Sequence, residues 1–258
     1  MVPRFHFGFF KIPPKPLTRE MPMENLSIIY RFTMGEKGEE SFTLSINPET
    51  LELIRSNDVK PPEWTRLGFN ICSHCPYTEE EVLFCPVAVS LADVTERFNS
   101  ILSYDTIEIE VVSSERVVKQ TSTAQRCVSS LIGLLMATSG CPHTAFFKPM
   151  ARFHLALSSE AETLYRAASM YLLSRYFLRL KGKGGELELD GLTEIYDRLQ
   201  TMNRHIAKRL RAASKADSTL NALVILDLYA EAAPYAIEDS LDSLEHLFDQ
   251  YLKEATLP

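Results

Sequence analysis

Apolar and polar positions alternate in four short segments of the chain, as they do in strands with one buried face. The segments are Leu26–Thr33, Ser41–Ile46, Thr106–Val112 and Arg116–Thr121. Residues 35–40 read GEKGEE and residues 113–115 read SSE, and each connection is short enough to close a hairpin. The pattern therefore predicts one small antiparallel sheet built from two β-hairpins, with a polar outer face.

Most of the remaining chain has apolar residues spaced three and four positions apart, which is typical of amphipathic helices. This spacing predicts helices from Ser90 onward, over about 122–138, over about 160–180, from Leu192 to Leu210, over 220–230 and after Pro234. Ser159 and Glu162 have the spacing of a capping box, in which each residue pairs with the other's backbone N–H group. We therefore predict an α+β fold: a small antiparallel sheet packed with a mainly helical body and a C-terminal helical bundle.

The Gly- and Lys-rich residues 181–185 (KGKGG) are the best candidate for a linker. They separate an α+β cysteine-containing module, residues 24–180, from a C-terminal helical region, residues 186–258. Prolines at positions 13, 14 and 16 interrupt residues 1–23, which have no secretory signal, so we expect an extended tail, with Met21 and Met23 as alternative start residues.

Composition and charge narrow the classes of function. A chain of 258 residues buries enough surface to fold without help from a metal or a disulfide. The net charge of −7 makes nucleic acid an unlikely partner. The chain contains no run of 18 apolar residues, so the sequence predicts no membrane-spanning helix. We expect a cytoplasmic protein, in which an odd number of cysteines, five, stay reduced and can serve a metal site or catalysis.

Cysteine spacing supplies the strongest candidate for chemistry. Cys72 and Cys75 form a C-x2-C unit that places two sulfurs on one turn, and Cys85 returns after nine residues. Cys141 follows the helix predicted over 122–138, and His143 lies two residues further on. We predict a metal site, with zinc as the expected metal, of four cysteines or of three cysteines and His143. Three of these cysteines precede proline, as in one iron–sulfur motif, so an iron–sulfur cluster is the alternative to zinc.

Three hypotheses of function remain open. In the first, the protein is a metal-binding protein with a mainly structural site. In the second, it is a metal- or iron–sulfur-dependent enzyme or a redox sensor, with His143 and His154 as acid–base candidates and Arg152 for an anionic group. In the third, it is a helical interaction module for protein or nucleic acid. Its contact face is then the basic patch Arg204, His205, Lys208, Arg209, Arg211 and Lys215.

Two further expectations concern residues outside these sites. Cys127 lies beside the apolar face of the helix predicted over 122–138, so we expect it to be a core residue. The C-terminal helices are the expected contact for a protein partner or for a second copy of the chain.

Three strings of residues suggest a family. They are CSHCPYTEEEVLFCPVAVSLADVTERF, SSLIGLLMATSGCPHTAFFKPMARFHL and ETLYRAASMYLLSRYF. From Asn25 to Phe177 the chain resembles an uncharacterised bacterial domain-of-unknown-function family with a C-x2-C-P…C-P…C-P-H pattern. The resemblance implies that the cysteine loop and the CPH segment belong to one module, and it brings no activity, substrate or cofactor.

Overall fold

The computed structural model describes residues 24–55, 60–185, 187–213, 219–223, 242 and 244–255. Its sheet has four antiparallel strands in the order β2-β1-β3-β4. The strands are β1 (Leu26–Thr33), β2 (Glu39–Ile46), β3 (Thr106–Val112) and β4 (Val117–Thr123). Two hairpins, β1–β2 and β3–β4, join through the pairing of β1 with β3. This architecture, with the helices described below, confirms the predicted α+β class.

Side chains alternate across the sheet as the hydrophobic pattern predicts. Tyr30 and Phe32 of β1 are fully buried, and Ile109 of β3 lies on the same inner face. On the outer face Arg31 pairs with Glu110 across β1 and β3, and Lys119 of β4 reaches the same carboxylate at 2.5 Å. The sheet therefore has one face for the core and one for solvent.

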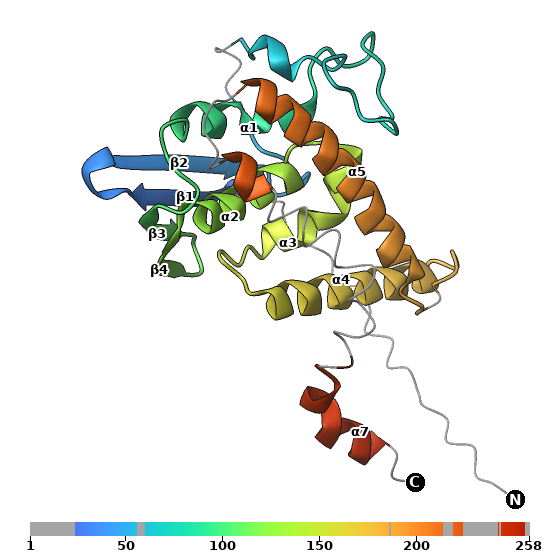
Figure 1. Ribbon diagram of the computed structural model, residues 1–258. Coiled ribbons are helices and arrows are strands. Elements are labelled where there is room, and N and C mark those ends of the chain that lie inside the picture. The colour runs from blue at the N-terminus through green and yellow to red at the C-terminus, as the bar shows by residue number, and fades with distance from the viewer. Residues whose placement is uncertain are drawn as a thin grey trace, which may run out of the picture.

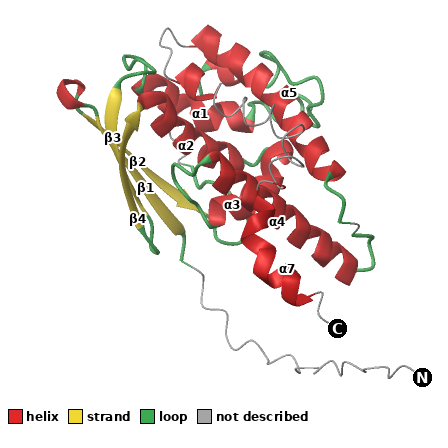
Figure 2. Ribbon diagram, turned by 60° about the horizontal axis from the view of Figure 1, so that its bottom comes forward, coloured by secondary structure: helices red, strands yellow, loops and turns green. Residues whose placement is uncertain are grey.

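The labelled α-helices lie to one side of the sheet in Figure 2, and Figure 1 labels them along the chain. They are α1 (Pro86–Arg97), α2 (Ala124–Ala137), α3 (Lys148–Arg152), α4 (Glu160–Leu180), α5 (Asp190–Ala213) and α7 (Asp249–Ala255). Short 3-10 helices include one at Pro142–Phe147, between α2 and α3.

Helices α1 and α2 provide most of the cover for the sheet. Phe98, which follows α1, packs edge-on against Phe32 of β1 and stacks on Phe42 of β2. Cys127 and Leu131 of α2 are fully buried in the same core, so the expectation that Cys127 is a core residue is confirmed. Helix α5 then crosses the outside of the helical layer and contacts α1 (Figure 1).

The capping box predicted at Ser159 is present. The Ser159 hydroxyl accepts from the Glu162 amide at 3.2 Å, and the Glu162 carboxylate accepts from the Ser159 amide at 2.7 Å. The helix along the Leu192–Leu210 seam is confirmed as α5. The helix predicted over 220–230 falls largely outside the described residues.

The predicted start of the first helix is wrong. Helix α1 begins at Pro86, one turn before Ser90, because Pro86 takes the first helical position. Ser90 lies inside the helix, where its hydroxyl donates to the Pro86 carbonyl at 2.9 Å and accepts from Arg55. Ser90 has the sequence spacing of an N-cap residue, but in the structure its hydroxyl bonds to the carbonyl four residues earlier in the same helix.

No helix among the described residues is both long and apolar enough to cross a membrane.

Candidate ligand-binding site

Two of the Cys-Pro pairs are helix starts. Cys85 is the N-cap residue of α1, and Cys141 is the N-cap residue of the 3-10 helix that begins at Pro142. Proline is favoured directly after an N-cap, because its φ angle suits the helix and it has no N–H group to leave unpaired. Pro86 and Pro142 are therefore explained by backbone geometry, without a ligand to the preceding sulfur.

The four cysteines named as ligands lie in one neighbourhood and are embedded in the core. Cys85 and Cys141 are each 8% exposed, while Cys72 and Cys75 are partly buried against the same core cluster. Burial, together with the nearby Cys85, Cys75 and Cys141, raises the pKa of Cys72 to about 12. Burial also raises the pKa of Cys141 to about 11. Cys72 and Cys141 are therefore neutral thiols at pH 7.

The predicted metal-binding function is wrong. Across the part of the chain that the structure describes, which includes all five cysteines, no group of three or more His, Cys, Asp or Glu side chains could hold a metal ion. The thiols pack as small apolar groups instead. The His143 imidazole, proposed as the fourth ligand, has its Nε2 atom 2.9 Å from the His74 carbonyl oxygen. Both cofactor predictions, zinc and an iron–sulfur cluster, depend on these cysteine and histidine donors.

One residue of the predicted basic patch is not on the surface, and Lys215 of the patch lies outside the described residues. Arg209 is 1% exposed and donates to the backbone carbonyls of Trp64, Arg66 and Leu67 at 2.6–2.9 Å. It ties α5 to the chain that precedes the cysteine loop. The cation predicted for a contact surface is thus part of the interior.

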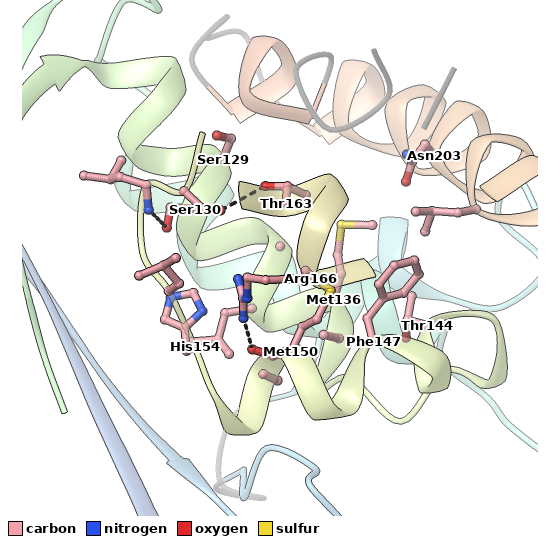
Figure 3. Close-up of a pocket in the computed structure, with 18 of the residues that line it drawn as sticks. Ser129, Ser130, Met136, Thr144, Phe147, Met150, His154, Thr163, Arg166 and Asn203 are labelled. Carbon is pink, nitrogen blue, oxygen red and sulfur yellow. Dashed lines mark hydrogen bonds between the residues drawn. The ribbon is translucent and has the colours of Figure 1, made fainter. Parts of the chain in front are cut away.

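A cavity of about 190 Å³ lies between α2, α3, α4, α5 and the 3-10 helix (Figure 3). Its apolar walls come from Leu134, Met136, Ala137, Phe147, Met150, Ala151, Leu155, Leu157, Tyr196 and Leu199, together with Gly133. Its polar lining is Arg126, Ser129, Ser130, Thr144, His154, Ser158, Thr163, Arg166 and Asn203. An apolar cavity with a few convergent polar groups is the usual form of a small-molecule site.

The hydroxyl groups of the cavity have partners within the protein. Ser129 and Thr144 donate to the backbone carbonyls of Arg126 and Cys141 at 2.9 and 3.1 Å. Ser130 accepts from the Leu157 amide at 3.1 Å. These hydroxyls are held by the fold and leave the recognition of a ligand to other groups.

Asn203 differs from these hydroxyls. It is 1% exposed, and neither its amide nitrogen nor its amide oxygen has a hydrogen-bond partner among the described residues. Burying such an amide without a partner costs about 1–3 kcal/mol. The side chain lines the cavity from α5 (Figure 3), so a bound molecule could supply both a donor and an acceptor to it.

His154 belongs to a hydrogen-bonded set at the base of the cavity. Its Nε2 atom lies 2.5 Å from the Tyr30 hydroxyl, which is itself 3.0 Å from the Ser130 hydroxyl. Burial, together with the charges of Arg166 and Arg116, lowers the pKa of His154 to about 4. The imidazole is therefore neutral at pH 7. Burial raises the pKa of Tyr30 as well, so the phenol keeps its proton.

The other acid–base candidate, His143, and the arginine named for an anionic group lie elsewhere. His143 and Arg152 are absent from the cavity lining, and Arg152 forms an ion pair with Glu115 at 3.4 Å. The structure thus places His154 in the cavity and leaves the two others outside it.

Sequence reasoning missed Asn203, although the chain contains a signal for it. Asn203 lies four residues after Leu199 and three before Ile206, within the apolar seam of α5. A polar residue in the middle of such a seam faces the interior and needs a partner there.

A family model described as a domain of unknown function (DUF6901) matches residues 28–249. No curated protein and no solved structure matches the chain.

Proposed function

Since the chain belongs to this family of unknown function, its role has to be argued from its site, and we propose that the protein binds a small organic molecule in the helix-lined cavity. The amide of Asn203 carries the proposal, because it is the polar lining group that is fully buried and has no hydrogen-bond partner among the described residues. A ligand group with one donor and one acceptor, such as an amide or a hydroxyl, satisfies it.

The size of the cavity limits the ligand. An apolar cavity of roughly 150 Å³ holds benzene. The present cavity of about 190 Å³ therefore suits a compact molecule of about ten non-hydrogen atoms. Ligands of this size bind with affinities between about 1 mM and about 1 µM, because each atom contributes a limited free energy. Its apolar walls favour a ligand with a hydrocarbon body.

The proposal is tested with a panel of four compounds of this size: octanoate, octanamide, phenylacetate and phenylacetamide. Binding to the full chain is measured by isothermal titration calorimetry and by the shift of the thermal midpoint. We expect saturable binding of at least one compound at one site per chain. Asn203→Leu is expected to weaken the binding of the amides, which offer both a donor and an acceptor, at least tenfold, since the replacement has similar volume and no polar atom.

Two variants make the test specific. Ala151→Met extends a flexible side chain from the cavity wall, so it should reduce binding by occupying the space. Asp197→Asn changes an exposed residue of α5 that does not line the cavity, and it should bind as wild type does. Absence of saturable binding by all four compounds, or equal binding of the amides by wild type and Asn203→Leu, would refute the proposal.

A further inference from the structure

The charges around the cavity are unbalanced. Its lining contains two cations, Arg126 and Arg166, and no aspartate, glutamate or lysine. The whole chain has 34 acidic residues against 27 Lys and Arg, so an acid-free lining runs against its overall charge.

Arg166 is the cation with the most constrained position. Its guanidinium donates through Nη2 to the backbone carbonyls of Met150 and Phe153, at 3.1 and 2.8 Å. These bonds fix the group at the junction of α3 and α4. The Nε and Nη1 groups have no hydrogen-bond partner within the described ranges, so they remain as donors toward the cavity.

The neighbouring acidic residue forms no ion pair with Arg166, although its charge acts to raise the pKa of the guanidinium. Glu162 lies one turn earlier on α4, and its carboxylate accepts from both the amide and the hydroxyl of Ser159, at 2.7 and 3.0 Å. No ion pair of Arg166 with any carboxylate occurs in the described part of the chain. The Glu162 carboxylate is used to cap the helix, and the guanidinium charge is left to act on the cavity.

Neighbouring groups report the same positive potential. Burial lowers the pKa of Arg166, and the charge of Arg116 lowers it further. Arg166 and Arg116 also lower the pKa of His154. A cation beside an apolar wall attracts an anion more strongly than the same cation in water, because the surrounding dielectric constant is lower.

Resting on the proposed function, we infer that the ligand is an organic anion, a carboxylate with an apolar body, whose negative end lies at Arg166 and Arg126. Figure 3 shows Arg166 and His154 at one end of the cavity and Asn203 toward the other. A carboxylate accepts charge-assisted hydrogen bonds from the Arg166 guanidinium. The hydrocarbon body lies against Met136, Met150 and Phe147, and Asn203 meets a polar group farther along.

A matched pair of probes tests the inference on the wild-type chain. Octanoate and octanamide have the same number of non-hydrogen atoms and the same hydrocarbon chain, and they differ in charge at pH 7. Phenylacetate and phenylacetamide repeat the comparison with a rigid body. We expect each carboxylate to bind at least tenfold more tightly than its amide in calorimetry.

Substitution of the arginines tests whether they cause the preference for the carboxylate. Arg166→Gln should weaken the binding of octanoate at least tenfold and leave that of octanamide within a factor of two. Because Arg166 also holds two backbone carbonyls, each variant is first checked for cooperative unfolding. If Arg166→Gln does not fold, Arg126→Gln and Arg166→Lys replace it, with the expectation that the first reduces and the second retains the preference for the carboxylate.

The outcomes separate this inference from the proposed function. Equal binding of carboxylates and amides by wild type, weakened by Asn203→Leu, overturns the anion and leaves the cavity as a binding site. Tighter binding of the carboxylates that survives both arginine-to-glutamine substitutions also overturns it. Failure of all four probes to bind overturns both.

Discussion

The cysteine region and the helix-lined cavity each contain an arginine that donates to backbone carbonyls, but Arg209 is fully buried whereas Arg166 is partly exposed. Arg209 lies where three backbone carbonyls converge and fills the space between α5 and the cysteine loop. Arg166 is fixed by two carbonyls and has the wall of a cavity beside it. A buried polar group within close packing serves the architecture. An arginine beside a cavity, with N–H donors that have no partner among the described residues, indicates a binding site for a ligand.

Removing Arg209 should have the largest effect. Arg209→Met leaves the carbonyls of Trp64, Arg66 and Leu67 without this donor, and we expect a loss of roughly 3–5 kcal/mol in the free energy of unfolding. Urea unfolding followed by circular dichroism measures the loss. Arg211→Met, at an exposed position on the same helix, is the control and should unfold near the wild-type midpoint. Similar stability of the two variants would contradict a structural role for Arg209.

The neutral state of His154 should appear as a pH dependence of stability. Its pKa in the folded protein is about 4, below the unfolded value of about 6.5, so the unfolded state takes up the proton first as the pH falls. Stability is full above pH 6.5 and declines between pH 6.5 and pH 4, by up to about 3 kcal/mol.

Urea unfolding at a series of pH values measures this decline. His154→Gln removes the titrating group, so its curve should be flatter than that of wild type in the same window. Equal slopes for the two proteins would show that His154 is not held neutral in the fold.

Asn203→Leu should stabilise the protein in the absence of ligand by about 1–2 kcal/mol, because it removes a buried amide that has no partner among the described residues. Asn47→Leu makes the same change where the side-chain oxygen accepts from the Glu49 and Thr50 amides, at 2.8 and 3.0 Å. This control should lose about 1 kcal/mol. Destabilisation by both substitutions would mean that the Asn203 amide is satisfied in solution.

A chelator should have no effect. Because the cysteines pack with the core and form no metal-binding group among the described residues, dialysis against EDTA should leave the thermal midpoint within error of the untreated protein. A metal that organised this region would contribute its binding free energy to folding, so its removal would lower the midpoint. A lowered midpoint that zinc restores would contradict the packing account of the cysteines.

Much of the fold follows from periodicity. The alternation in Leu26–Thr33 and Thr106–Val112 predicts β1 and β3 to the residue, because one buried face fixes the register of polar and apolar positions. The Leu192–Leu210 seam likewise identifies α5. The exact start of a helix is harder to predict from the sequence. Ser90 has the sequence signature of an N-cap, whereas α1 begins at Pro86.

The candidate site is harder to predict. Cysteine spacing suggested a metal, but the Cys-Pro signal arises twice from a proline at the first position of a helix. The cavity gathers residues from α2 to α5 and depends on which side chains fail to fill the space between helices. Asn203 could have been noticed within its apolar seam, whereas the partner it lacks is a property of the folded structure.

The most direct test of the binding claim is an NMR titration of the chain labelled with ¹³C at the methionine methyl groups. Met136 and Met150 line the cavity, while Met34 lies in the core at the end of β1, away from it. With the four-compound panel, saturable shifts of the Met136 and Met150 signals with an unmoved Met34 signal would support binding in the cavity. Unmoved Met136 and Met150 signals at millimolar concentrations of all four compounds would contradict it.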